Sequence, residues 1–361
     1  MVDNRFCYFL SFLFILTVVG CSGISDKFKA TPTAISASNT IVVIADEDLW
    51  EGPVGDTFRY KYEGPYIIMP QPEEIFDLKY FTPLQMEEGS IRKELRTYIY
   101  LADLSDTTSM TTKAVRADLG ASLYAQAMKN PSINNKVGKD KWAFGQMIIY
   151  IFGNGQNNLI DNIDKTFASV RKKVNDFDRP QIAAKTYLKG VNQLLTSGLK
   201  DKFGITMDIP GEYVLAVEDS TTTWLRRDEK EMIMNILISK IPYRSKDQFT
   251  KEGFKELFKK TSKAVISSST PGSSMIVNDE DLPLFSVTLE VDKTYAQEYK
   301  GIWEMSYDYM GGPFFAYLIK HPHRDEILLV NVFIFAPGEK KRDHMQLLEH
   351  IVSSLKFMSP G

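Results

Sequence analysis

The stretch IIYIFGNGQNNLIDNIDKTF, residues 148–167, runs in the order strand, glycine turn, helix. Its apolar run ends at Gly153, Asn154 and Gly155, and a helical pattern of apolar residues begins at Leu159. A loop that holds a phosphate group at a helix N-terminus has the same order. The stretch therefore predicts a strand–turn–helix unit and raises the question of a nucleotide site.

The residues around this turn do not complete a nucleotide-binding motif. A dinucleotide fingerprint requires a third glycine at the position of Asn158, and an acid at the tip of the next strand. Asp176 and Asp178 have the right separation but follow the helical pattern. Asn157 or Asn158 is better suited as a helix N-cap. We expect no nucleotide, and the formal net charge of −3 predicts no nucleic-acid partner.

The same order returns near the C-terminus, in VNVFIFAPGEKKRDHMQLLEHIVSSLKF. A second pair of stretches, LRTYIYLADLSDTTSMTTKAV and IMNILISKIPYRSKDQFTKEGF, each run strand, polar loop, helix. We therefore predict an α+β fold of two related halves, each a mostly antiparallel sheet with helices packed on one face. A single sheet that continues through both halves is the alternative.

Apolar periodicity predicts the individual elements of both halves. We expect strands at residues 41–44, 66–69, 95–101, 147–152, 213–217, 232–238, 314–320 and 327–335. We expect helices over residues 112–129, 159–174, 180–198, 254–258 and 345–355. The strand at 327–335 is apolar on both faces and should be central in its sheet. The serine-rich segment 262–283 predicts a long surface loop or a functional lid.

The N-terminus has the pattern of a secretion signal. Arg5 precedes an apolar segment, residues 6–19, which is too short to span a bilayer. The segment ends in VVGC at residues 18–21, which resembles the lipobox of bacterial lipoproteins, in which the cysteine receives a diacylglycerol. An ordinary signal peptide followed by a chance cysteine is the alternative. We predict that Cys21 is lipidated and holds the protein at the membrane.

The predicted organisation has four parts. They are a lipoprotein signal peptide at 1–20, lipidated Cys21 with a flexible stem over 21–39, an N-terminal half at 40–205 and a C-terminal half at 206–361. The chain has two cysteines, so signal cleavage and lipidation would leave no disulfide. Asp does not follow Cys21 directly, so an inner-membrane retention signal is absent. This favours an outer-membrane anchor.

Signatures of catalysis and metal binding are weak. His321 and His323 flank Pro322, but two histidines alone do not make a metal site. The acid runs ADEDLWEG and NDEDLP lack the ligand spacing of a calcium-binding EF-hand loop. The sequence contains neither G-x-S-x-G nor H-E-x-x-H. We expect no metal, no cofactor and no enzyme activity.

The stretch GIWEMSYDYMGGPFF, residues 301–315, is the strongest candidate for a ligand site. As one strand, it would place Trp303 on one face and Glu304 and Asp308 on the other. The Gly-Gly-Pro sequence that follows cannot continue a regular central strand, so we expect a bulge or a bend. A ligand groove floored by the acids and a half-buried strand with a corner are the two interpretations. The predicted ligand-binding residues are Trp303, Glu304, Asp308, Gly311, Gly312 and Pro313, with Trp224 and Arg226 as the second choice.

These residues favour a non-enzymatic binding or assembly module. Trp303 would stack on a glycan or peptide while the acids accept hydrogen bonds. The rival is a hydrolase of envelope polymers. Glu304 and Asp308 on one strand face would lie about 13 Å apart, whereas glycosidase carboxylates need roughly 5 to 9.5 Å. A hydrolase would therefore need carboxylates from different strands.

Several stretches together resemble a known family. They are GIWEMSYDYMGGPF, FAPGEKKRDHMQLLEHIVSSLKF, IPGEYVLAVEDSTTTWLRR, WEGPVGD and MPQPEEIFDL. They are similar to an uncharacterised family of lipoproteins from Bacteroidota, domain of unknown function 4837, and the resemblance spans residues 40–358. It implies an envelope lipoprotein of a Gram-negative cell and brings no activity. The stem lacks the lysine-and-acid cluster associated with surface export in that phylum, which favours the periplasmic face.

Overall fold

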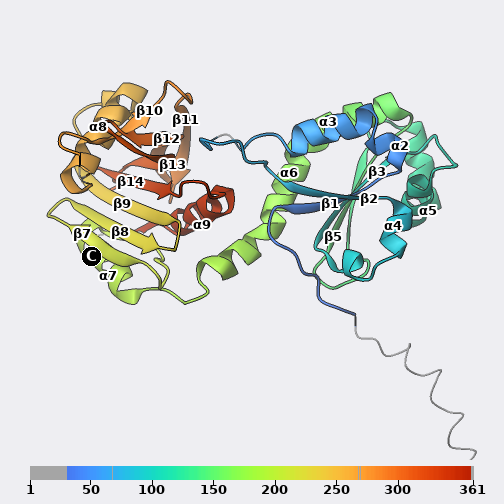
Figure 1. Ribbon diagram of the computed structural model, residues 1–361, viewed down its shortest axis with the longest axis horizontal. Helices are drawn as coiled ribbons and strands as arrows, with labels where there is room; N and C mark the ends of the chain where they lie inside the picture. The colour runs from blue at the N-terminus through green and yellow to red at the C-terminus, as the bar shows by residue number, and fades with distance from the viewer. Residues whose placement is uncertain (1–30, 67, 267, 269, 359–361) are drawn as a thin grey trace, which may run out of the picture. The chain divides into compact units, whose positions relative to one another are not determined.

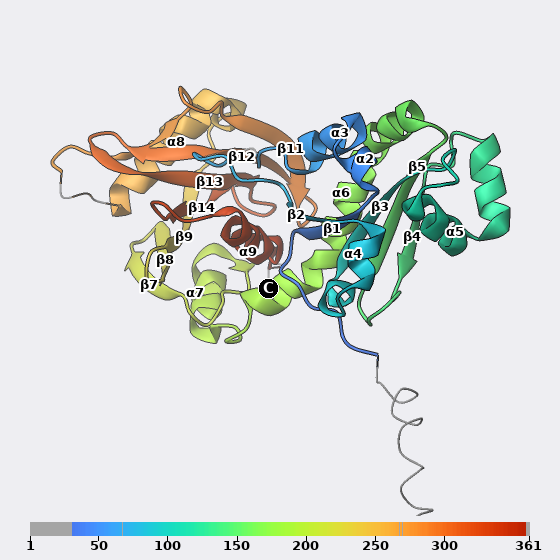
Figure 2. The same cartoon turned by 45° about the vertical axis from the view of Figure 1, so that its right-hand side comes forward.

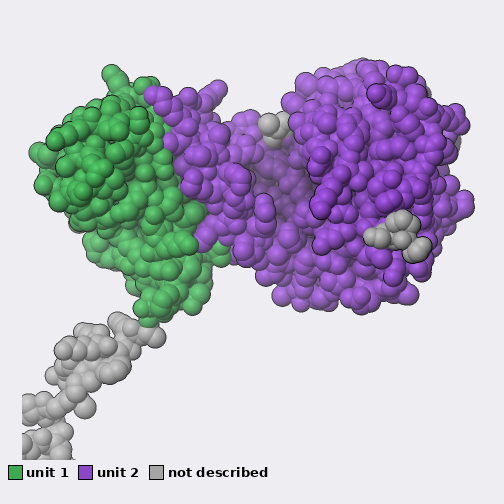
Figure 3. All heavy atoms as spheres, turned by 180° about the vertical axis from the view of Figure 1, so that it is seen from behind, with its two compact units in different colours: residues 1–54, 79–162 green, residues 55–78, 163–361 purple. Residues whose placement is uncertain are grey.

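The computed structural model describes residues 31–358 except 67, 267 and 269, so the predicted signal peptide and Cys21 lie outside the described residues. The chain forms two compact units (Figure 3). Unit 1 comprises Met1–Val54 and Lys79–Asn162, and unit 2 comprises Gly55–Leu78 and Ile163–Gly361. The short segment 55–78 therefore belongs to the unit formed by the second half of the chain.

Unit 1 is built on a five-stranded sheet in the order β2-β1-β3-β5-β4. Its strands are β1 (Thr40–Ile44), β2 (Asp77–Phe81), β3 (Thr97–Asp103), β4 (Asn135–Lys139) and β5 (Met147–Gly153). The ladders β1–β3 and β3–β5 are parallel, and β4 is antiparallel to β5. Parallel neighbours need a long connection, and α5 (Met110–Lys129) lies in the one between β3 and β5.

Both faces of the unit 1 sheet are buried, because β1, β3 and β5 are buried at every position. On one face, Tyr100 and Tyr150 pack with Val115 and Leu119 of α5. The smaller elements of unit 1 are α2 (Glu47–Trp50), α4 (Pro83–Glu87) and the 3-10 helix η2 (Ile91–Glu94). Two helices begin in unit 1 and continue into unit 2, α3 (Pro53–Tyr62) and α6 (Gln156–Thr186).

Unit 2 contains an eight-stranded antiparallel sheet in the order β10-β12-β13-β14-β9-β8-β7, with β11 paired to β12. Its strands are β7 (Val214–Glu218), β8 (Thr222–Asp228), β9 (Ile233–Pro242), β10 (Met275–Asn278), β11 (Phe285–Val291), β12 (Thr294–Met305), β13 (Asp308–Lys320) and β14 (Glu326–Phe335). The prediction that residues 327–335 are central is confirmed, since β14 lies between β13 and β9.

Helices cover both faces of this sheet (Figures 1 and 2). Phe254 and Phe258 of α8 (Lys251–Val265) pack on one face. Helices α7 (Gln193–Phe203) and α9 (Arg342–Ser353) pack on the other. The remaining elements are the 3-10 helix η3 (Lys246–Phe249) and a two-stranded pair of β6 (Ile205–Thr206) with β15 (Lys356–Phe357).

The α+β class with two sheet-bearing halves is confirmed, and antiparallel pairing predominates in the chain. Three features go beyond that prediction. The sheets are separate, so the alternative of one continuous sheet is wrong. The central ladders of unit 1 are parallel. Helices lie on both faces of the unit 2 sheet because its strands are apolar on both sides.

Three predicted elements are corrected. The described residues 66, 68 and 69 are not in a strand, and their loop is joined by an isolated bridge between Pro65 and Glu74. Pro180 starts no helix: it lies inside α6, where buried Val174 and Thr186 hold the turns on either side. The segment 262–283 contains the end of α8 and all of β10, so it is not structureless. Within the described residues, no helix is long and apolar enough to cross a membrane.

Candidate functional site

The glycine turn between β5 and α6 is filled by a side chain of unit 1 itself. Asp103, at the end of β3, accepts hydrogen bonds from the amides of Gly155 at 2.8 Å and Ser105 at 2.9 Å. A carboxylate thus takes the backbone donor that a phosphate would need at a helix N-terminus. The predicted N-cap is corrected: α6 begins at Gln156, and Asn158 within its first turn accepts the amide of Asn154 at 3.0 Å.

The stretch GIWEMSYDYMGGPFF forms a hairpin rather than one bent strand. Strand β12 ends at Met305, and β13 begins at Asp308, its pairing partner. Alternation stops at the two-residue turn between them, which is why Tyr307 is exposed although Trp303 is buried. Glu304 and Asp308 therefore lie on neighbouring strands, which corrects the expected separation along one strand.

The Gly-Gly-Pro sequence lies inside β13, and the expected bulge is found directly before it. Gly311 and Gly312 pair with Glu304 and Trp303 of β12, but Met305 pairs with Asp308, so Tyr309 and Met310 of β13 are the extra residues at the register shift. The ladder between β13 and β14 begins one residue after Pro313, where a backbone donor is again present. The strand tolerates the proline because it precedes that second ladder.

Gly312 leaves room for the indole of Trp303. A Cβ on Gly312 would lie 2.0 Å from the carbonyl oxygen of Ile334 and 3.3 Å from Trp303 Nε1. Through this gap, Trp303 Nε1 donates a hydrogen bond to the Ile334 carbonyl of β14 at 3.2 Å. Its ring also packs edge-on against Phe333, with centroids 5.4 Å apart. Trp303 is 3% exposed, so it forms a floor and offers little ring surface for stacking on a ligand.

Five of the predicted ligand-binding residues line one cavity of about 450 Å³, which we call the hairpin cavity. These five are Trp303, Glu304, Asp308, Gly311 and Gly312. Segments distant in sequence complete the walls: Pro70 and Gln71 after α3, Asn278 and Asp281 around the end of β10, and Lys341 before α9. Pro313, Trp224 and Arg226 do not line it.

Carboxylates dominate the charge of the hairpin cavity. The side-chain amide of Asn278 donates to Glu304 Oε2 at 2.9 Å and to Asp281 Oδ2 at 2.8 Å, so these two carboxylates lie side by side. Asp308 is engaged on both oxygens, by Ser268 Oγ at 2.6 Å and by the amide of Tyr309 at 2.8 Å. Three acids thus face one ammonium, that of Lys341, among the described residues that line the cavity.

Glu73 holds the cavity wall formed by Pro70 and Gln71. Its two carboxylate oxygens accept the amides of Lys341 at 2.8 Å and Arg342 at 2.9 Å, at the N-terminus of α9. A carboxylate at this position satisfies unpaired amides and interacts favourably with the helix dipole. The Arg342 guanidinium completes the junction by donating to the carbonyl of Glu74 at 2.7 Å.

The second-choice residues Trp224 and Arg226 lie on β8 and form internal links. Trp224 Nε1 donates to Asn235 Oδ1 at 3.1 Å, and the side-chain Nδ2 of Asn235 donates to the carbonyl of Phe333 at 3.3 Å. Arg226 forms an ion pair with Asp228. These bonds tie β8 to β9 and β14 and leave Trp224 without a free donor.

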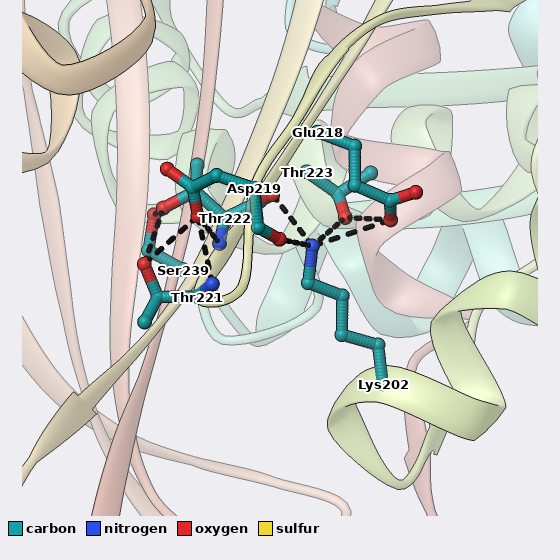
Figure 4. Close-up of polar contacts among 7 residues, drawn as sticks. All are labelled: Lys202, Glu218, Asp219, Thr221, Thr222, Thr223 and Ser239. Atoms are coloured by element: carbon teal, nitrogen blue, oxygen red, sulfur yellow. Dashed lines mark hydrogen bonds and ion pairs between the residues drawn. The ribbon is translucent and has the colours of Figure 1, made fainter.

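Lys202 at the end of α7 is enclosed by oxygen atoms (Figure 4). Its Nζ donates to the carbonyls of Asp219 and Thr222 and to Thr223 Oγ1, and it lies 3.2 Å from Glu218 Oε1. A lysine has three donors, so no donor remains for a ligand. The hydrogen bonds from Thr223 and then Lys202 hold the pKa of Glu218 below its usual value. The cluster anchors the β7–β8 hairpin to α7.

The histidine pair is also used internally. The Nδ1 atom of His321 accepts the amide of His323 at 3.1 Å, so it is not free to bind a metal. Burial lowers the pKa of His321. In the part of the chain that the structure describes, no group of three or more His, Cys, Asp or Glu residues could hold a metal ion.

Comparison with known families divides the chain in two. Residues 34–187 match the domain of unknown function DUF8532, and residues 192–354 match the domain of unknown function DUF4837. The first part of the chain is thus similar to one family of unknown function and the second part to another. The resemblance to DUF4837 predicted for residues 40–358 is thus found in the second half, and the first half matches a different model.

No curated protein matches the chain. Among solved structures, the human StarD13 (DLC2) lipid transfer and protein localization domain matches 45% of this chain and 96% of its own length, with 10% sequence identity and a TM-score of 0.21. A likeness this weak carries no argument about function.

The region that matches the DUF4837 model supplies the hairpin and most of the walls of the hairpin cavity. The sequence prediction missed Asn278 and Asp281. Both residues belong to the NDEDLP run, which the sequence analysis considered only as a possible calcium-binding loop. Their place in the cavity depends on the pairing of Asn278 with Ile302 across β10 and β12, which no local pattern reveals.

Proposed function

We propose that the protein is a lipid-anchored cell-envelope module whose DUF4837 domain binds a positively charged group of a protein or peptide partner in the hairpin cavity. The pair of carboxylates around Asn278 carries this proposal. Glu304 Oε1 and Asp281 Oδ1 have no hydrogen-bond partner among the described residues. A guanidinium or ammonium group placed between them would receive charge-assisted hydrogen bonds from both sides.

The size and rim of the cavity also favour one side chain or a small amine. A volume of about 450 Å³ lies at the small end of ligand pockets. Tyr309 stands fully exposed on the rim, one residue after Asp308. An exposed tyrosine beside a pocket supplies contact area at low entropic cost, which is typical of binding surfaces.

The anchor and location belong to the same proposal and rest on VVGC at residues 18–21. Two or three acyl chains on Cys21 would hold the protein stably at a membrane, in our proposal the outer membrane with the body facing the periplasm. We expect Cys21→Ala to shift the protein from the membrane fraction to the soluble fraction. Unprocessed Cys21→Ala protein that stays in the membrane would contradict the anchor.

The binding site can be tested by photocrosslinking in the cells that make the protein. A photoreactive phenylalanine analogue replaces Tyr309 on the cavity rim and, as a matched control, Leu194, which is 82% exposed on α7. We expect a discrete adduct from position 309 alone. The adduct should disappear in the Glu304→Gln/Asp281→Asn double variant, which keeps the side-chain volumes. Equal adducts from both positions, or an adduct that survives neutralisation, would contradict the site.

One observation favours a second candidate, a hydrolase of envelope polymers. The fold brings two carboxylates from separate segments to one cavity, Glu304 of β12 and Asp281 of the loop after β10. Adjacent carboxylates can divide the roles of acid and base. Incubation with envelope polysaccharide and analysis of the products by mass spectrometry separates the candidates. Cleavage that Glu304→Gln abolishes would replace the binding proposal with this one.

A further inference from the structure

A second cavity of about 420 Å³ lies at the other ends of strands β12 and β13. We call it the aromatic cavity, and its lining residues are Tyr243, Lys246, Phe249, Tyr295 and Lys320. Tyr295 is near the start of β12 and Trp303 near its end, a distance of about 26 Å along an extended strand. The aromatic cavity is therefore separate from the hairpin cavity.

The aromatic walls are held in place from outside the cavity. Phe249 packs edge-on against Tyr295, with ring centroids 5.2 Å apart, and lies tilted against Tyr243 at 6.4 Å. The carbonyl of Phe249 accepts a hydrogen bond from Tyr299 Oη at 2.6 Å. Tyr299 in turn stacks on Phe254 of α8, with centroids 3.9 Å apart. The rings are thus preorganised by the core, which lowers the entropic cost of binding.

Two lysines make this cavity positive. Lys320 Nζ lies 4.5 Å from the ring centre of Tyr243 and 3.1 Å from Asp325 Oδ1. Lys246 is exposed and has no hydrogen bond or ion pair within the described residues. The hydroxyl groups of Tyr243 and Tyr295 likewise have no partner there. None of the five lining residues is acidic. Asp325 offsets part of the charge of Lys320, so the ammonium of Lys246, which is unpaired within the described residues, is the main attraction for an anion.

We propose that the aromatic cavity binds a carboxylated sugar ring, such as a uronic acid unit of an acidic polysaccharide. The apolar C–H face of a pyranose fits against tyrosine and phenylalanine rings, and its hydroxyl groups match the free tyrosine hydroxyls. Lys246 and Lys320 pair with the carboxylate. A neutral sugar leaves Lys246 without a counter-charge, and an acidic peptide lacks a flat apolar ring face.

Isothermal titration calorimetry on the detergent-solubilised full chain tests this proposal with three probes of four units each. They are tetragalacturonate, neutral galactotetraose and tetraglutamate. We expect tetragalacturonate to bind with a dissociation constant of roughly 1 mM or below, and the other two at least tenfold more weakly. Raising the salt from about 50 mM to about 500 mM should weaken the binding several-fold. No binding of tetragalacturonate, or equal binding of tetraglutamate, would overturn the proposal.

Variants locate the site. Lys246→Gln should weaken tetragalacturonate binding roughly three- to tenfold and flatten its salt dependence, whereas Lys260→Gln, at an exposed position of α8, should leave both unchanged. Tyr295→Ala, at a position 48% exposed, should weaken it about tenfold. The Glu304→Gln/Asp281→Asn variant should bind the sugar normally. The proposal for the aromatic cavity can therefore fail independently of the proposal for the hairpin cavity. Unchanged binding in both Lys246→Gln and Tyr295→Ala would overturn the assignment.

Discussion

The two ends of the unit 2 sheet carry cavities of opposite character. The hairpin cavity is acidic and combines the β12–β13 hairpin with segments distant in sequence, including the loop after α3. The aromatic cavity is positive and uses residues at or near the ends of β9, β12 and β13, together with η3. The same antiparallel strands thus support two unrelated chemistries. We therefore expect the shape of the hairpin cavity to depend more on single long-range contacts than the shape of the aromatic cavity does.

The largest expected effect comes from closing the gap at Gly312. In Gly312→Ala, the new methyl group meets the Ile334 carbonyl at 2.0 Å, so β13 or the Trp303 indole must move. We expect the free energy of unfolding to be about 3 kcal/mol lower than that of the parent protein, as measured by urea denaturation. Gly198→Ala in α7, where a Cβ meets open space, is the matched control and should be neutral or stabilising. Equal stability of Gly312→Ala and parent would show that Trp303 does not need this gap.

A smaller effect is expected from the long-range cap of α9. Glu73→Ala removes the acceptor for two amides and loosens the Pro70–Gln71 wall. The expected loss of stability is about 1 to 2 kcal/mol. Glu74→Ala is the control, because its carboxylate makes only a 3.7 Å surface contact with Lys340 and should cost less than about 0.5 kcal/mol. Indistinguishable thermal unfolding of these two variants would contradict the role of Glu73.

The smallest expected effect is the pH dependence of stability that comes from His321, which follows Lys320 at the end of β13. Burial lowers the pKa of His321, so the folded state binds fewer protons than the unfolded state. Stability from this group is present above the unfolded pKa, near 6.5, and is lost as pH falls towards the folded pKa. His321→Asn keeps an acceptor for the His323 amide but does not titrate. Stability measured from pH 7.5 to 5 should fall less steeply in this variant; an identical slope would contradict the assignment.

Local sequence predicted elements better than it predicted their partners. Both strand–turn–helix stretches are present, and each has a glycine with positive φ in its turn, Gly155 at 93° and Gly338 at 81°. Yet β5 lies between a parallel and an antiparallel neighbour, whereas β14 has two antiparallel neighbours. Apolar alternation and turn glycines act within a few residues, while strand order depends on the connections and on packing across the whole unit.

The candidate site shows the same limit. From the sequence, strand alternation and the Gly-Gly-Pro sequence singled out Glu304, Asp308 and the two glycines as candidates. It could not show the turn between β12 and β13, since the apolar pattern passes through it unchanged. It also could not show Asp281 or Glu73, whose roles depend on contacts with segments distant in the chain. Only the folded sheet brings these carboxylates to their places.

The most direct test of the central claim is the NMR signal of the Trp303 indole N–H during titration with tetralysine. This proton lies at the floor of the hairpin cavity, and the Trp224 indole on β8 serves as an internal control. We predict that tetralysine shifts the Trp303 signal and not the Trp224 signal, and that Glu304→Gln/Asp281→Asn abolishes the shift. Tetragalacturonate should leave Trp303 unmoved. A Trp303 signal that does not shift with tetralysine, or that shifts equally in the double variant, would contradict binding of a positively charged group in the hairpin cavity.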